Sequence, residues 1–146
     1  MARKVFFSFQ YTDVQRVMNV RNSNVVASNQ GVGFIDKAEF ETVEREGDTA
    51  IRNWINKQLE GTSVTVVLVG ATTDQSKWVK YEIEASKARG NGILTVNISQ
   101  IRDLAQQTTQ YCGMTVPGYS NYNWVTQDGR TNLGIWVEAA AKAAGR

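Results

Sequence analysis

Hydrophobic positions along the chain fall into short continuous runs that alternate with amphipathic stretches. The continuous runs predict strands, which we place at 4–9, 31–36, 63–70 and 93–98, with one more short strand near Trp124. The helical spacing of apolar residues predicts helices at 14–28, 48–59, 77–89 and 132–143. The asparagines near 22–24 weaken the first of these helices and allow a break there. The run 63–70 is β-branched or apolar at nearly every position, which is typical of a strand buried on both faces.

This alternation predicts an α/β fold with a mostly parallel, four- to five-stranded sheet and helices on both faces. We expect the flavodoxin-like strand order 2-1-3-4, with a ligand crevice at the carboxyl ends of the first and third strands. A chain of 146 residues can bury a full core, so we expect a single domain over 1–146.

The segment 76–86 carries the candidate chemistry. Val79 and Ile83 are four residues apart and predict a buried helix face, while Trp78 and Glu82 share the neighbouring face. A helix that follows a buried strand starts near the carboxyl edge of the sheet. Glu82 is therefore expected in an early helical turn, close to the crevice.

Composition narrows the chemistry further. The chain has no histidine, which excludes Ser-His-Asp and Cys-His nucleophile pairs and imidazole metal sites. Cys112 is the single cysteine, so neither an internal disulfide nor a thiolate zinc cluster is expected. We predict no metal site, so catalysis would depend on carboxylates, hydroxyls, aromatic rings and backbone amides.

Charge and hydropathy set expectations for partners and compartment. The formal net charge of +2 does not favour nucleic acid as a partner. No signal peptide and no apolar stretch near 18 residues is visible, so we expect a cytoplasmic protein without a membrane partner.

Two motifs together resemble the TIR domain family, most closely the ThsB-like TIR proteins of bacterial Thoeris anti-phage systems. Residues 4–9 read Lys-Val-Phe-Phe-Ser-Phe and are similar to the opening TIR strand, although Lys4 replaces the usual aspartate. Residues 76–82 read Ser-Lys-Trp-Val-Lys-Tyr-Glu and are similar to the TIR catalytic helix. The resemblance extends over residues 3 to 98, with Asp13 where the pattern often has a further acidic residue.

The resemblance implies a flavodoxin-like TIR fold and cleavage of NAD, which is a substrate and not a bound cofactor. It implies an NAD nucleosidase or ADP-ribosyl cyclase whose product is a cyclic or modified ADP-ribose messenger in antiviral defence. The implied partners are NAD, other copies of the chain in a homo-oligomer or activator-dependent assembly, and a phage-derived activator.

The resemblance also assigns roles to residues. Glu82 is the implied catalytic glutamate, and the loop from Asp36 to Glu46 is the implied border of the pocket. The expected substrate-binding residues are Ser8, Phe9, Gln10, Asp36, Ser76 and Trp78.

Other interpretations stay open. The domain is alternatively a non-enzymatic interaction module that works by homotypic assembly. A receiver-like domain fits poorly, because its phosphoacceptor aspartate is missing from the third strand end.

The acidic residues between 36 and 48 form either a solvated loop or a metal site, although their spacing fits no EF-hand. Trp78 serves either helix packing or ligand contact. The aromatic residues of 106–128 either pin this irregular stretch to the core or form a binding surface.

Overall fold

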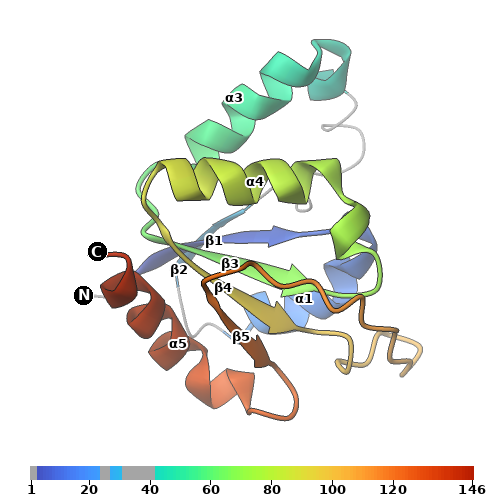
Figure 1. The fold of residues 1–146 in the computed structure, drawn as a ribbon. Helices are drawn as coiled ribbons and strands as arrows, with labels where there is room; N and C mark the ends of the chain where they lie inside the picture. Colours follow the sequence, from blue (N-terminus) through green and yellow to red (C-terminus); the bar gives the residue numbers. More distant parts are fainter. Residues whose placement is uncertain (1–2, 24–26, 31–41) are drawn as a thin grey trace.

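A five-stranded parallel sheet forms the centre of the molecule in the computed structural model, which describes residues 3–23, 27–30 and 42–146 (Figure 1). The described strands have the order β2-β1-β3-β4-β5, and each neighbouring pair is parallel. Their bounds are β1 Lys4–Phe9, β2 Ala27–Gln30, β3 Val64–Val69, β4 Gly92–Asn97 and β5 Ser120–Asn123. The predicted α/β class with a parallel sheet is confirmed.

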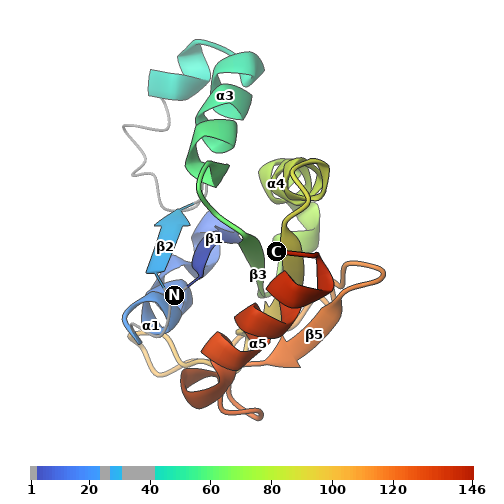
Figure 2. The same ribbon diagram turned by 90° about the vertical axis from the view of Figure 1, so that its left-hand side faces the viewer.

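Helices cover both faces of this sheet. The long described helices are α1 (Val14–Arg21), α3 (Asp48–Leu59), α4 (Lys77–Ala88) and α5 (Gly129–Ala143). Residues 42–45 are also helical, and short 3-10 turns lie at Tyr11–Asp13 and Thr73–Gln75. Figure 2 shows α1 and α5 on one side of the sheet and α3 and α4 on the other. The same division appears in the core, because one face packs Val17 and Val137 while the other packs Ile51 and Val79.

Strand β3 is buried along its whole length, as its composition predicts. It lies between β1 and β4, with Phe7 opposite Val66 and Val66 opposite Leu94. A strand paired on both edges and covered on both faces has no contact with water, which explains why β-branched and apolar residues fill it. The carboxyl ends of β1 and β3 consequently lie side by side.

Helix α4 begins and ends at local sequence signals. Ser76 is its N-cap residue, and the Ser76 hydroxyl accepts a hydrogen bond from the Val79 amide at 3.2 Å. After Ala88 the chain reverses at Gly90, whose positive φ of 77° is accessible to glycine without steric cost. These two signals fix which residues of α4 face the sheet.

The first helix is shorter than its sequence predicts. Helix α1 ends at Arg21, whereas the prediction continued it to residue 28, and Ala27–Gln30 forms strand β2 instead. Pairing with β1 explains this correction, because Lys4 lies opposite Ala27 and a sheet partner outweighs weak helical periodicity. The strand predicted at 31–36 lies outside the described residues. Asp13 is the N-cap residue of α1, but its side chain makes no capping hydrogen bond.

The last helix also differs at its start. Helix α5 begins at Gly129, three residues before the predicted start, and β5 ends just before Trp124. A side chain at position 129 would overlap the Trp124 ring, so glycine permits the helix to begin directly under that indole. Residues 101–104, between β4 and β5, form no helix.

The segment after β4 is irregular but well anchored. Arg16 on α1 donates hydrogen bonds to the carbonyl groups of Ile101 and Gln107, both at 2.9 Å. Further along, the Cys112 amide donates to the Gly70 carbonyl at 3.0 Å. The segment therefore crosses the carboxyl edge of the sheet.

Close packing of α5 on β4 depends on Gly92. A Cβ atom at this position would overlap the backbone carbonyl of Ala140, which cannot rotate away as a side chain can. We predict that Gly92→Ala lowers the free energy of unfolding by about 1–3 kcal/mol, the usual cost of overpacking. Chemical denaturation followed by circular dichroism measures the change, with Ser120→Ala on the exposed part of β5 as the control. Equal stability of the two variants would contradict the packing described.

Candidate functional site

Glu82 is buried inside the protein and hydrogen-bonded to a residue of the first strand. Its side chain is only 1% exposed. The Ser8 hydroxyl donates to Glu82 Oε1 at 2.7 Å, and both groups are buried. The structure therefore joins two predicted site residues that are 74 positions apart in the sequence.

The phase of α4 explains how Glu82 reaches Ser8. Val79 and Ile83 pack against Val67 and Val69 of β3, which fixes one face of the helix on the sheet. Glu82 precedes Ile83 by one residue and is turned by about 100° from it, toward β1. Ser8 lies opposite Val67 in the β1–β3 pair, so its hydroxyl projects toward the same helix.

Trp78 packs on the outer flank of α4. It lies against the cluster formed by Phe6, Ile51, Ile55 and Leu59, and it meets Tyr81 edge to face at 6.1 Å between ring centroids. Lys77 Nζ lies 4.9 Å from the Trp78 ring centroid. Helix packing is thus an observed role of Trp78, while ligand contact stays a prediction.

The remaining predicted site residues have different positions. Phe9 is 2% exposed and belongs to the core on the α1 and α5 side, opposite to Ser8. Gln10 is partly exposed at the end of β1, and Ser76 is the buried cap of α4. Asp36 lies outside the described residues. The structure thus brings Ser8 and Glu82 into contact but does not test substrate binding by these residues.

Asp13 is an acidic residue of this edge that the sequence analysis related to the TIR pattern but did not place in the site. Its side chain is 4% exposed, and its Oδ2 atom has no hydrogen-bond partner in the described part of the chain. The carboxyl group presses against Gly70, where a Cβ atom would overlap both carboxyl oxygens. Its position directly after the first strand was the signal available in the sequence.

Burial changes the acidity of Asp13. Loss of water around the carboxyl group raises its pKa above the ordinary value of 3.8, and the nearby Arg16 guanidinium partly opposes this rise. Arg16 is itself buried and directs its hydrogen bonds to Ile101 and Gln107. Its charge therefore acts on Asp13 through space, without an ion pair between the two.

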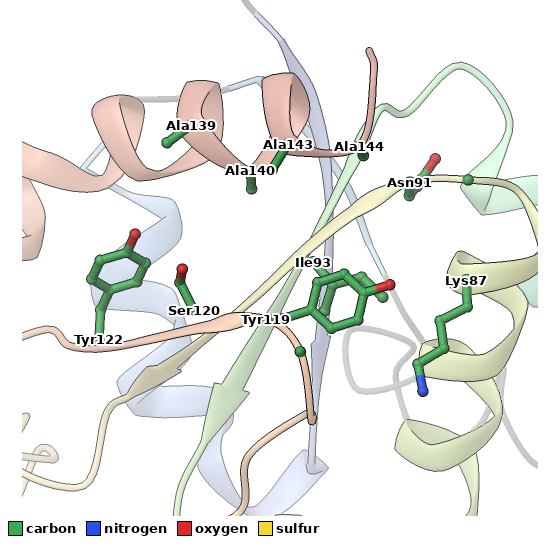
Figure 3. Close-up of a pocket in the computed structure, with 12 residues that line it drawn as sticks. Lys87, Asn91, Ile93, Tyr119, Ser120, Tyr122, Ala139, Ala140, Ala143 and Ala144 are labelled. Carbon is green, nitrogen blue, oxygen red and sulfur yellow. The ribbon is translucent and has the colours of Figure 1, made fainter.

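A pocket of about 320 Å³ lies at the opposite edge of the sheet (Figure 3). Its walls come from the end of α4, the starts of β4 and β5 and the last turns of α5. Tyr122 points toward the alanines of α5, whereas Tyr119 points toward Lys87 (Figure 3). Glu82 does not line this pocket. The pocket is therefore separate from the carboxyl edge that holds the predicted site.

Neither a metal-binding cluster nor a membrane-spanning helix occurs within the described residues. No group of three or more histidine, cysteine, aspartate or glutamate residues is arranged to hold a metal ion in the ranges 3–23, 27–30 and 42–146. Within those same ranges, no helix has both the length and the apolar character needed to cross a membrane.

Comparison with known proteins identifies the family. The model of the Thoeris protein ThsB, TIR-like domain, matches residues 6–103. A Bacillus cereus (strain MSX-D12) protein named "Putative cyclic ADP-D-ribose synthase ThsB1" is 42% identical over 106 residues, which is 70% of this chain. The aligned part is 55% of that relative, so the chain spans about half the length of the curated relative it matches.

A parallel α/β domain with a glutamate buried on the helix after its third strand is typical of the TIR class. The chain belongs to the ThsB TIR-like family, and the predicted resemblance is confirmed. The match ends at residue 103, so the family model covers neither the segment 104–128 nor helix α5.

The Ser8–Glu82 hydrogen bond gives a first testable prediction for the site. Ser8→Ala should lower the free energy of unfolding by about 1–3 kcal/mol, because a buried carboxyl oxygen loses its donor. Chemical denaturation measures this loss. In a Glu82→Met background the same serine change should cost much less, since no carboxyl group is left unsatisfied. A loss of equal size in both backgrounds would contradict the pairing.

The raised pKa of Asp13 predicts a pH-dependent stability. A group whose pKa is higher in the folded state favours folding below its unfolded pKa, near 3.8, and this contribution disappears as pH rises through the folded pKa. Relative to Asp13→Asn, the native chain should therefore be most stable in acid and lose that advantage toward neutral pH. Thermal melting of both proteins across this range measures the difference, which should stay constant if Asp13 titrates normally.

Proposed function

We propose that this chain is a TIR-like enzyme that cleaves NAD between nicotinamide and ribose and forms a cyclic or modified ADP-ribose messenger in antiviral defence. Glu82, buried and held by Ser8 at 2.7 Å, is the observation that carries the proposal. Membership of the ThsB TIR-like family and the name of the Bacillus cereus relative support the same reaction.

The reaction suits a chain without histidine. When the bond between nicotinamide nitrogen and ribose carbon breaks, the electron pair stays on the nitrogen, so the cationic pyridinium leaves as neutral nicotinamide without a proton donor. The ribose carbon becomes positively charged, as in glycoside hydrolysis. A carboxylate in a fixed position stabilises that charge more effectively than a mobile one, because no reorganisation is needed during the reaction.

The serine partner contributes to this fixed position. Ser8 belongs to a strand paired on both edges, and Glu82 belongs to a helix whose Val79 and Ile83 pack on β3. The hydrogen bond between the two side chains restricts the Glu82 rotamer. In the proposed mechanism Glu82 supports the ribosyl cation, which then reacts with water or with a nucleophile of a nucleotide.

The proposed partners follow from the family. We include in the proposal a homo-oligomer or activator-dependent assembly and a phage-derived activator. An assembly module without enzyme activity is the rival function, and the same experiment addresses it.

The decisive experiment compares two glutamates of α4. Glu82 is buried, whereas the Glu84 side chain is 72% exposed two residues later, so Glu84→Gln is a matched control. We expect Glu82→Gln to reduce nicotinamide release from NAD by at least about 10²-fold, since the developing charge loses its stabilising carboxylate. Glu84→Gln should leave the rate unchanged.

Release is measured by chromatography and the product by mass spectrometry, with and without extract from phage-infected cells. Unchanged activity in Glu82→Gln would contradict the role of Glu82. A chain that assembles but neither binds nor cleaves NAD under either condition would favour the interaction module.

A further inference from the structure

One oxygen of the buried Asp13 carboxyl group has no hydrogen-bond partner among the residues that the structure describes. A carboxyl group removed from water is costly unless its oxygens accept hydrogen bonds, so unsatisfied examples in native proteins call for a specific explanation. Asp13 is 4% exposed, and within the described residues no donor bonds to its Oδ2 atom. Arg16, three residues farther along the chain, donates its hydrogen bonds to backbone carbonyls and forms an ion pair with Asp103 at 3.6 Å.

The position of Asp13 points toward a ligand. Its carboxyl group lies against Gly70, the first residue after β3, at the edge where parallel α/β sheets bind their ligands. Because glycine has no side chain at position 70, the Asp13 carboxyl group occupies the space where a Cβ atom would otherwise lie. Gly70 also has well-defined neighbours: its amide donates to the Thr73 hydroxyl at 2.8 Å, and its carbonyl accepts from Cys112.

Asp13 and Glu82 lie at different positions along the sheet and on opposite faces of it. Ser8, the partner of Glu82, lies opposite Val67, and Gly70 follows Val67 by three residues, just past the end of β3, which corresponds to about 10 Å of extended chain. The two carboxyl groups also approach from opposite faces, because Ser8 faces α4 whereas position 70 follows Val66 and Leu68 toward the α1 side. A single sugar ring is too small to contact both groups, whereas a dinucleotide has two riboses.

We propose that Asp13 is a specificity-determining residue that accepts a hydrogen bond from the 2′-hydroxyl of the second ribose, the one attached to adenine. The inference rests on the proposed function and extends it from the reacting ribose to the other end of NAD. An acidic side chain on this hydroxyl is a general device of dinucleotide sites. It also rejects NADP, whose 2′-phosphate supplies no donor and would place negative charge against a buried carboxyl group.

The test measures binding, so that it does not depend on activation of the enzyme. NAD and NADP are titrated by calorimetry into the full chain carrying Glu82→Gln, which prevents turnover. We expect this reference protein to bind NAD more tightly than NADP. Adding Asp13→Asn should reduce the NAD preference about tenfold or more, since the amide keeps the shape of the side chain but has one acceptor oxygen and no charge.

Two further variants separate recognition from folding. Asp13→Ala removes the acceptor altogether, and Gly70→Ala displaces the carboxyl group without removing it, so each should reduce the preference in the same direction. Asp74→Asn, which neutralises an exposed carboxylate after the same strand, should leave it unchanged. Circular dichroism confirms that each titrated variant is folded, and the ratio of two affinities in one protein is insensitive to modest destabilisation.

The outcomes distinguish the two proposals. If the reference protein binds NAD, but Asp13→Asn and Asp13→Ala keep its preference within about twofold, Asp13 is only a packing residue and this inference is wrong. A reference protein that binds NADP as tightly as NAD overturns it equally. If NAD does not bind even with Asp13 intact, the proposed function fails and the inference fails with it.

Discussion

The central constraint in this protein is the cost of keeping carboxyl groups out of water at the carboxyl edge of a fully buried strand. Strand β3 has no exposed residue, so any side chain that packs against its end is desolvated as well. Glu82 meets this cost with a hydrogen bond from Ser8. Asp13 lies against Gly70 with a raised pKa, and its Oδ2 atom accepts no hydrogen bond from the described part of the chain. The energy and the pKa of a buried polar group depend strongly on its hydrogen-bond partners. A catalytic site uses this dependence to adjust the pKa of its reactive groups.

Helix α4 converts the arrangement of the sheet into the geometry of the site. Its N-cap at Ser76 fixes where the helix begins, and Val79 and Ile83 fix which face lies on the sheet. These apolar contacts and the cap determine the direction of Glu82 before any polar contact is made. The residues that pack and the residue proposed to react are thus neighbours on one helical surface, which explains why the motif 76–82 is informative despite its short length.

Most of the fold was predictable because its signals are local. The continuous apolar run of β3 and the stripe of Ile51, Ile55 and Leu59 on α3 specify their own structure. The asparagines near 22–24 indicated where α1 could end, but the strand Ala27–Gln30 was not predictable, because it forms only through pairing with β1. In the site, Glu82 could be proposed from its motif. The environment of Asp13 could not, because Gly70 is 57 positions away and contact between the two exists only after β1 and β3 pair.

Arg16 has a mechanical consequence beyond its charge. One guanidinium group joins α1 to both ends of the loop 101–107. The chain after this loop reaches Cys112, whose amide donates a hydrogen bond to the Gly70 carbonyl. A rigid planar group with several simultaneous bonds transmits displacement more faithfully than a flexible contact. We therefore expect a shift of α1 to displace the loop 101–107 as well, so that the helix and the loop move together and not independently.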